Sequence, residues 1–228
     1  MHLFLSAVSS VTVILLLSAC QLQPRFNSEL SLVSPSQNHL VRSGQSVRGA
    51  ELTTYTEQGQ AVPLKIGDVE LDATDPDQEI YLYTVLYQTD TSSSWQNLCV
   101  PDAEGVDKAI PLSVHWDATV AHIDYGGVTF ACTNGFLSKC VRWGYKPWKS
   151  FEGNSLRDFH QACTRMARAD YCGDGVGHTK NGTPINIYDR LKIQTPSPDT
   201  EMTFEAAWTP DGAMEINHTR WPEALKDV

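Results

Sequence analysis

The sequence is poor in positive charge. Its 17 Lys and Arg side chains are outnumbered by 27 Asp and Glu, which leaves a formal net charge of −10 at pH 7. A surface of that sign repels phosphate backbones and argues against nucleic acid as a partner. At 41% hydrophobic and 19% charged residues, the 228-residue chain is not disordered in composition and can enclose a substantial core. No internal repeat is present, so a solenoid or propeller is not expected.

A long hydrophobic run is also missing. The apolar stretch from Val11 to Leu17 is too short and too close to the N-terminus for a membrane span, and no Lys or Arg precedes it. It leads into Leu17-Ser18-Ala19-Cys20, which resembles the lipobox of bacterial lipoproteins. The resemblance implies that residues 1–19 are a signal peptide and that Cys20 becomes the lipidated first residue. An ordinary secretory signal or an uncleaved anchor is the alternative.

The residues after Cys20 suggest how the chain is held. Gln21 rather than Asp follows the cysteine, which in enteric-type sorting favours the outer over the inner membrane. Residues 20–38 are rich in Ser, Gln and Pro without periodicity, so we expect a tether there and a single folded domain over residues 39–228. We therefore expect a lipid-anchored protein of the bacterial cell envelope, with the membrane as its first partner.

The patterning of the mature chain is mostly that of β-strands. Residues 80–87 form the strongest candidate, and because both faces are apolar or aromatic we expect a central strand covered on both sides. Residues 61–71 read as one or two strands, with a break at Pro63 or at Gly67. Further strands are expected at residues 110–116, 127–132, 184–188 and 202–208.

One principal helix is expected over about residues 155–170. Ser155 and Asp158 form a capping-box pattern, and Gly173 is placed to end the helix. Its buried stripe is expected to comprise Leu156, Phe159, Cys163 and Met166. A short second helix is expected near residues 136–143, and Asn181-Gly182 predicts a hairpin turn. The fold class is therefore α+β, β-rich, with antiparallel sheets and one main helix.

Beyond Cys20 the chain has an odd set of five cysteines, for which disulfides are the expected state outside the cytosol. Two bridges and one thiol can be drawn about fifteen ways. Cys172 lies beyond the end of the helix that carries Cys163, too far along the axis for these two to be joined. The disulfide candidates are Cys132, Cys140, Cys163 and Cys172, with a bridge from one of the first two to one of the last two. Cys99 is then the expected odd thiol.

The segment from residue 160 to residue 178 supports three sharper hypotheses. A zinc site would use His160, Cys163, Cys172 and His178. A calcium site would use Asp170 and Asp174, although two positions of the EF-hand pattern lack ligands. A nucleophilic thiol at Cys172 or Cys99 would need a neighbouring base. The simpler interpretation is that the carboxylates accept backbone N–H bonds and the thiols form disulfides, so no cofactor is predicted.

A cationic segment interrupts the acidic chain. Residues 139–168 hold seven Lys and Arg against two acidic residues, with aromatic side chains between them. An exposed face of this kind would suit an anionic envelope glycan or another envelope protein, because rings stack on sugars and cations hold anions. That face would comprise Arg142, Trp143, Tyr145, Lys146 and Trp148. If the aromatic side chains are buried, they are core residues instead.

One motif carries a family resemblance. Ala169-Asp170-Tyr171-Cys172, with the preceding Gln161-Ala162-Cys163 and Arg165, resembles the signature of the ADYC domain family. Residues 143–148 and 181–185 also resemble that family, so the similarity spans about residues 95–194. The resemblance implies a bacterial, often secreted or lipid-anchored, cysteine-bearing domain. No activity comes with it, so no catalytic residues are assigned.

These observations favour a noncatalytic binding or structural module stabilised by disulfides. The alternative is an envelope enzyme or metal-binding protein that uses the region from Asp170 to His178. The two differ in one respect that a structure can show. An active region would lie open to solvent with unpaired thiol or carboxylate groups, whereas a structural region would be packed and cross-linked.

Overall fold

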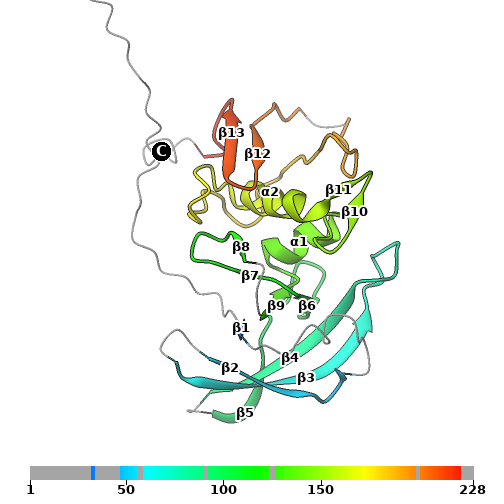
Figure 1. The fold of residues 1–228 in the computed structure, drawn as a ribbon, viewed down its shortest axis with the longest axis vertical. Coiled ribbons are helices and arrows are strands. Elements are labelled where there is room, and N and C mark those ends of the chain that lie inside the picture. Colours follow the sequence, from blue (N-terminus) through cyan, green and yellow to red (C-terminus); the bar gives the residue numbers. More distant parts are fainter. Residues whose placement is uncertain are drawn as a thin grey trace, which may run out of the picture.

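The largest element of the computed structural model is a seven-stranded antiparallel sheet (Figure 1). The structure describes residues 32–33, 47–55, 59–89, 92–123, 127–198 and 201–221. The strands follow the order β1-β9-β6-β4-β3-β2, and β5 pairs with β4. Their bounds are β1 Leu32–Val33, β2 Glu51–Tyr55, β3 Ala61–Leu71, β4 Tyr81–Thr89, β5 Ser92–Asn97, β6 Ala109–Leu112 and β9 Gly127–Cys132.

Strand β4 is central, as its two apolar faces predict. Tyr83 and Val85 are fully buried in one core cluster, together with Leu64 and Ile66 of β3. Leu82 points to the opposite face and joins a second cluster, which includes residues of β6 and of the first helix. The side chain of Tyr83 therefore serves packing rather than ligand binding.

Strand β3 resolves the ambiguity of residues 61–71. It is one strand of 11 residues, and Pro63 lies within it, paired with Thr53. The break expected at Gly67 is a β-bulge, because the register of β3 against β4 shifts between Ile66 and Asp68. A bulge bends a strand without ending it.

The tether expected at residues 20–38 is partly a strand. Leu32 and Val33 pair with Val128 and Gly127 of β9, so two residues of that stretch add an edge to the sheet. Residues 1–31 and 34–46, and with them the expected signal peptide and Cys20, lie outside the described residues. None of the helices in the described ranges has the length and apolar character that crossing a membrane requires.

Two helices lie on one side of the sheet, the first against it and the second on the first. The first is α1, Phe136–Arg142, and the second is α2, Leu156–Arg168. Ser155 caps α2 by accepting the Arg157 N–H at 3.3 Å, as predicted. The helix ends earlier than Gly173, because Ala169 takes the left-handed conformation at φ 53° that glycine usually supplies.

The remaining strands form three two-stranded pairs. They are β7 His115–Trp116 with β8 His122–Ile123, β10 Ser150–Phe151 with β11 Asn154–Ser155, and β12 Ala206–Thr209 with β13 Gly212–Ile216. The helices lie between the large sheet and the β12–β13 hairpin (Figure 1). The strand expected at residues 184–188 is absent from the described structure. The turn at Asn181-Gly182 forms, but the segment after it pairs with no strand.

One disulfide joins the two helices, and another lies at the large sheet. Cys140 of α1 is bonded to Cys163 of α2, which is one of the four pairings that the sequence left open. Cys99 is bonded to Cys132, so the expectation that Cys99 is the odd thiol was wrong. The β4–β6–β9 pairing brings these two cysteines to a Cα separation of 5.4 Å, within the usual range for a bridge. Cys172 is also disulfide-bonded.

Candidate functional site

The turn after α2 is organised by a buried ion pair. We call residues 169–175 the Tyr171 corner. Asp170 is 1% exposed and accepts from the Arg165 guanidinium at 2.7 Å. The same carboxylate accepts the backbone N–H groups of Asp174 and Gly175 at 3.1 and 3.0 Å. Arg165 also donates to the carbonyls of Pro210 and Thr119, so one side chain ties α2 to two distant loops.

Tyr171 connects the corner to the C-terminal part of the domain. Its hydroxyl donates to Glu205 at 2.7 Å and accepts the backbone N–H of Arg220 at 2.7 Å. Glu205 and Arg220 form an ion pair at 3.0 Å. Burial of the Tyr171 ring, with the Glu205 carboxylate beside its hydroxyl, raises the pKa of this phenol. Tyr171 therefore stays neutral, so that its hydroxyl can donate to Glu205 and accept from Arg220 at the same time.

The corner also packs directly against the β12–β13 turn. Ala213 donates its N–H to the Tyr171 carbonyl at 2.9 Å. A Cβ on Gly173 would overlap the backbone carbonyl of Asp211, and φ at Gly173 is +66°. Only glycine fits such an approach without displacing the turn. The corner thus fixes the position of β12.

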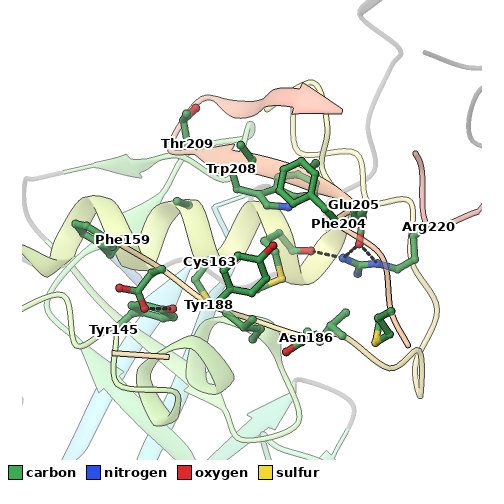
Figure 2. Close-up of a pocket in the computed structure, with 18 of the residues that line it drawn as sticks. Tyr145, Phe159, Cys163, Asn186, Tyr188, Phe204, Glu205, Trp208, Thr209 and Arg220 are labelled. Carbon is green, nitrogen blue, oxygen red and sulfur yellow. Dashed lines mark hydrogen bonds and ion pairs between the residues drawn. The ribbon is translucent and has the colours of Figure 1, made fainter. Parts of the chain in front are cut away.

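A pocket of about 1140 Å³, which we call the α2 pocket, opens beside the β12–β13 hairpin (Figure 2). Helix α2 contributes Asp158, Phe159, Ala162, Cys163 and Met166 to it. The segments 183–190 and 201–210 form the two sides, and Tyr145, His218 and Arg220 complete the lining. Tyr188 and Phe204 line it while remaining 47% and 41% exposed, so apolar surface stays accessible to solvent. This size is ample for a small-molecule site or a short peptide.

Polar groups at the two ends of the pocket are paired with each other. At one end Tyr145 donates to Asp189 at 2.9 Å, and at the other Glu205 holds Arg220 (Figure 2). Burial and the Asp189 carboxylate raise the pKa of Tyr145 well above its usual value. Asp189 further accepts backbone N–H groups of the loop that follows it. The ends are therefore rigid, and the middle is apolar.

A comparison with protein families shows which family this chain belongs to. The model of the ADYC domain matches residues 44–222. The chain belongs to the ADYC domain family. Neither a curated protein nor a solved structure matches it. The match is wider than the 95–194 similarity inferred from motifs, because it also takes in the strands before residue 95 and the β12–β13 hairpin.

In the ADYC domain the signature residues hold the fold together. Ala169 ends α2, Asp170 neutralises Arg165, and Tyr171 fixes the C-terminal segment. Asp174 accepts the Val176 N–H at 2.8 Å. In the region proposed for an alternative enzyme or metal site, Asp170, Tyr171 and Gly175 are buried, whereas Cys172, Asp174 and His178 are half-buried.

The zinc hypothesis lacks one of its sulfur ligands. Cys163 is bonded to Cys140 and cannot bind a metal as a thiolate. His160 instead contacts the Leu137 carbonyl at 3.0 Å. The described part of the ADYC domain holds no group of three or more His, Cys, Asp or Glu arranged for a metal ion. The calcium candidates Asp170 and Asp174 accept backbone N–H groups of their own loop, and Asp170 is also paired with Arg165.

The expected glycan-binding face is not a free surface. The Lys146 ammonium is 4% exposed and lies 2.7–2.9 Å from the carboxylates of Asp75, Asp77 and Glu79. Burial acts to lower the pKa of Lys146, but these three partners outweigh it and raise that pKa. The positive segment therefore neutralises an acidic loop of the same chain.

Other members of that face are committed as well. Arg142 pairs with Asp72 at 2.7 Å and with Asp102 at 3.3 Å. Tyr145 is buried and bonded to Asp189, and Trp143 packs against the cluster that surrounds the Cys140–Cys163 bridge. Trp148 is 40% exposed, which leaves one ring rather than a face.

A histidine pair connects β8 to α2. His122 Nε2 and His160 Nδ1 are 3.1 Å apart, and the rings stack at 5.2 Å. His160 Nε2 donates to the Leu137 carbonyl, so His160 Nδ1 must accept from His122 when both rings are neutral. Burial, together with the nearby His160, Arg157 and Arg165, lowers the pKa of His122 to about 3. Burial lowers the pKa of His160 to about 4.

Mild acid is therefore expected to destabilise the domain. Both pKa values are lower in the folded chain than in the unfolded one, so below about pH 6.5 the unfolded chain binds the extra protons. From pH 7 to pH 5 the free energy of unfolding should fall by about 2 to 4 kcal/mol through this pair. Urea unfolding across that range measures it. In a His122→Asn/His160→Gln variant the slope should flatten, and an equally steep slope there would contradict the assignment.

Sequence reasoning missed most of the pocket. Tyr145 and Cys163 were singled out for other roles, whereas Tyr188, Phe204 and Trp208 were interpreted as parts of strands. A signal was present, because residues 183–204 alternate apolar residues with Pro, Ser and Asn over a stretch too irregular for a sheet. Such a stretch must find its partners outside regular pairing.

Proposed function

We propose that this ADYC domain is a noncatalytic binding module of the bacterial envelope that takes a mainly apolar ligand in the α2 pocket. The observation that carries the proposal is the pocket itself, about 1140 Å³ with accessible aromatic surface between two rigid ends. Exposed apolar surface of this kind costs solvation free energy unless something covers it, and it therefore marks a binding site.

The chemistry of the lining supports binding rather than catalysis. Among the described lining residues, the one sulfur nucleophile, Cys163, is consumed by a disulfide. Tyr145 is bonded to Asp189, and its raised pKa keeps it protonated. Glu205 and Arg220 neutralise each other. The pocket thus supplies shape, apolar area and a stable framework.

Filling part of the pocket with a larger side chain is expected to weaken ligand binding. Ala162 lies half-buried on the helix that floors the pocket, so an Ala162→Trp side chain would occupy part of the cavity. The neutral apolar fluorophore N-phenyl-1-naphthylamine should brighten on binding the wild-type domain, and its Kd should rise at least about tenfold in the variant. Met214→Ala is the matched control, because Met214 is 75% exposed and does not line the pocket. Equal fluorescence titrations for wild type and Ala162→Trp would refute the proposed site.

We also propose that the domain is anchored through lipid on Cys20, with the outer membrane as the favoured destination. The lipobox-like Leu17-Ser18-Ala19-Cys20 and Gln21 support this. A sulfur that carries lipid cannot also form a disulfide, and Cys20 is the one cysteine of the six outside the described residues. Lipidation of Cys20 and a bond from Cys172 to Cys20 are therefore mutually exclusive in one molecule.

Mass spectrometry of the membrane-extracted protein distinguishes the two states. We expect a mature chain that begins at a lipid-modified Cys20, and release of the protein into the soluble fraction by Cys20→Ala. A retained leader, or a peptide in which Cys20 is disulfide-linked to Cys172, would contradict lipid anchoring.

A further inference from the structure

Runs of consecutive residues line both sides of the α2 pocket. All eight residues from Thr183 to Arg190 line it, and so do all four residues of β12, Ala206–Thr209. Successive side chains of a strand point to opposite faces. A pocket that touches every residue of β12 therefore borders the edge of that strand, where backbone N–H and C=O groups are presented.

These edges have hydrogen-bonding capacity to spare. Within the described residues no hydrogen bond uses the backbone N–H or C=O groups of Ile185, Asn186, Ile187 or Tyr188. Strand β12 pairs with β13 alone among the described strands, which leaves its second edge without a strand partner. Unpaired strand edges are templates for another extended chain.

The charges of the residues that line the pocket favour basic residues at the ends of such an extended chain. Asp158, Asp189, Glu201 and Glu205 line the pocket against Arg190 and Arg220, an acidic excess of two. Asp158 and Glu201 are exposed and form no ion pair within the described part of the chain. Arg190 donates to Asn154 and lies over the Phe159 ring, so its charge is already engaged by the chain. The rim therefore favours positive charge on whatever occupies the pocket.

We propose that the occupant is a peptide segment in extended conformation, which adds as a strand along the pocket edges and carries apolar side chains flanked by Lys or Arg. This inference rests on the proposed function, because it names the ligand of the same pocket. Backbone pairing supplies affinity, and the recesses around Tyr188, Phe204 and Met166 accept alternate side chains. The unpaired acids at the rim hold the basic flanks.

The test uses a random nonapeptide library displayed on phage and selected on the intact disulfide-bonded domain, with counter-selection on Ala162→Trp. We expect enriched peptides with alternating apolar residues and basic ends. Synthetic versions of these peptides, N-methylated at two alternate amides, should bind at least about tenfold more weakly, since each lost N–H removes one backbone hydrogen bond. Bound peptide should also slow amide hydrogen exchange at residues 185–188 or 206–209.

Each other outcome has a definite meaning. If the fluorophore binds but no peptide is enriched, or if N-methylation leaves the affinity unchanged, the strand-addition inference is wrong and the apolar pocket stands. If neither fluorophore nor peptide binds, both proposals fail. A Glu201→Lys variant should weaken binding of the selected peptides but leave the Kd of the neutral fluorophore unchanged, and equal peptide binding would remove the proposed role of the acidic rim.

Discussion

Loss of the two described disulfides is expected to leave the domain close to unfolded. Cys99–Cys132 and Cys140–Cys163 close separate loops with sequence separations of 33 and 23. Each such loop restricts the unfolded chain by about 3 to 4 kcal/mol. Because domains of this size have total stabilities of roughly 5 to 15 kcal/mol, losing both removes about half or more of it.

The Cys140→Ala/Cys163→Ala variant isolates the helix bridge. Its free energy of unfolding in urea should fall by about 3 kcal/mol or more, because both sulfurs are also buried against Tyr145 and Met166. The Cys99→Ala/Cys132→Ala variant is the companion measurement on the sheet. An unfolding midpoint that is unchanged in either variant would show that the bridge does not form in the folded protein.

Asp170→Asn is expected to cost about 3 to 5 kcal/mol of stability. The change leaves the Arg165 guanidinium, which is 2% exposed, without a counter-ion in a water-poor site. It also weakens the carboxylate bonds to the N–H groups of Asp174 and Gly175. Thermal and urea unfolding measure the loss directly.

Two comparisons sharpen this result. Asp174→Asn should cost about 1 kcal/mol or less, because Asp174 is half-buried and accepts one backbone bond. Adding Arg165→Met to Asp170→Asn should recover part of the loss, since it removes the unpaired charge. A fully stable Asp170→Asn protein would return Asp170 to the list of functional carboxylates.

Local rules predicted the elements that are specified locally. Ser155 begins α2 because its hydroxyl meets an N–H two residues along, and the stripe at Leu156, Cys163 and Met166 is buried as its spacing predicts. The two apolar faces of residues 80–87 likewise predicted the central strand. Each of these features depends on neighbours within one or two turns or on a single strand.

Features that depend on distant partners were not predictable. Lys146 lies in a cationic run, yet its three carboxylate partners are about seventy positions earlier in the chain. Cys99 meets Cys132 only after β4, β6 and β9 have paired. The turn at Asn181-Gly182 is correct, but a turn cannot supply the strand that residues 184–188 would need as a partner.

The pocket was harder still to predict, because a cavity between elements leaves no pattern in the sequence. It arises where the Tyr171 corner fixes β12 and where the loop after residue 183 runs across α2 without pairing. The family signature drew attention to Asp170 and Cys172. In the structure Asp170, through Arg165, and Tyr171 hold in place the β12–β13 wall of a pocket that other residues line.

The central claim is that the Tyr171 corner is structural and that the α2 pocket binds the ligand. Its most direct test is a heteronuclear NMR titration of the oxidised domain with N-phenyl-1-naphthylamine. The account predicts saturable shifts at residues 159–166, 183–190 and 206–209, with Asp170 and Asp174 little changed. Shifts centred on residues 170–178, or no saturable shift anywhere, would contradict it.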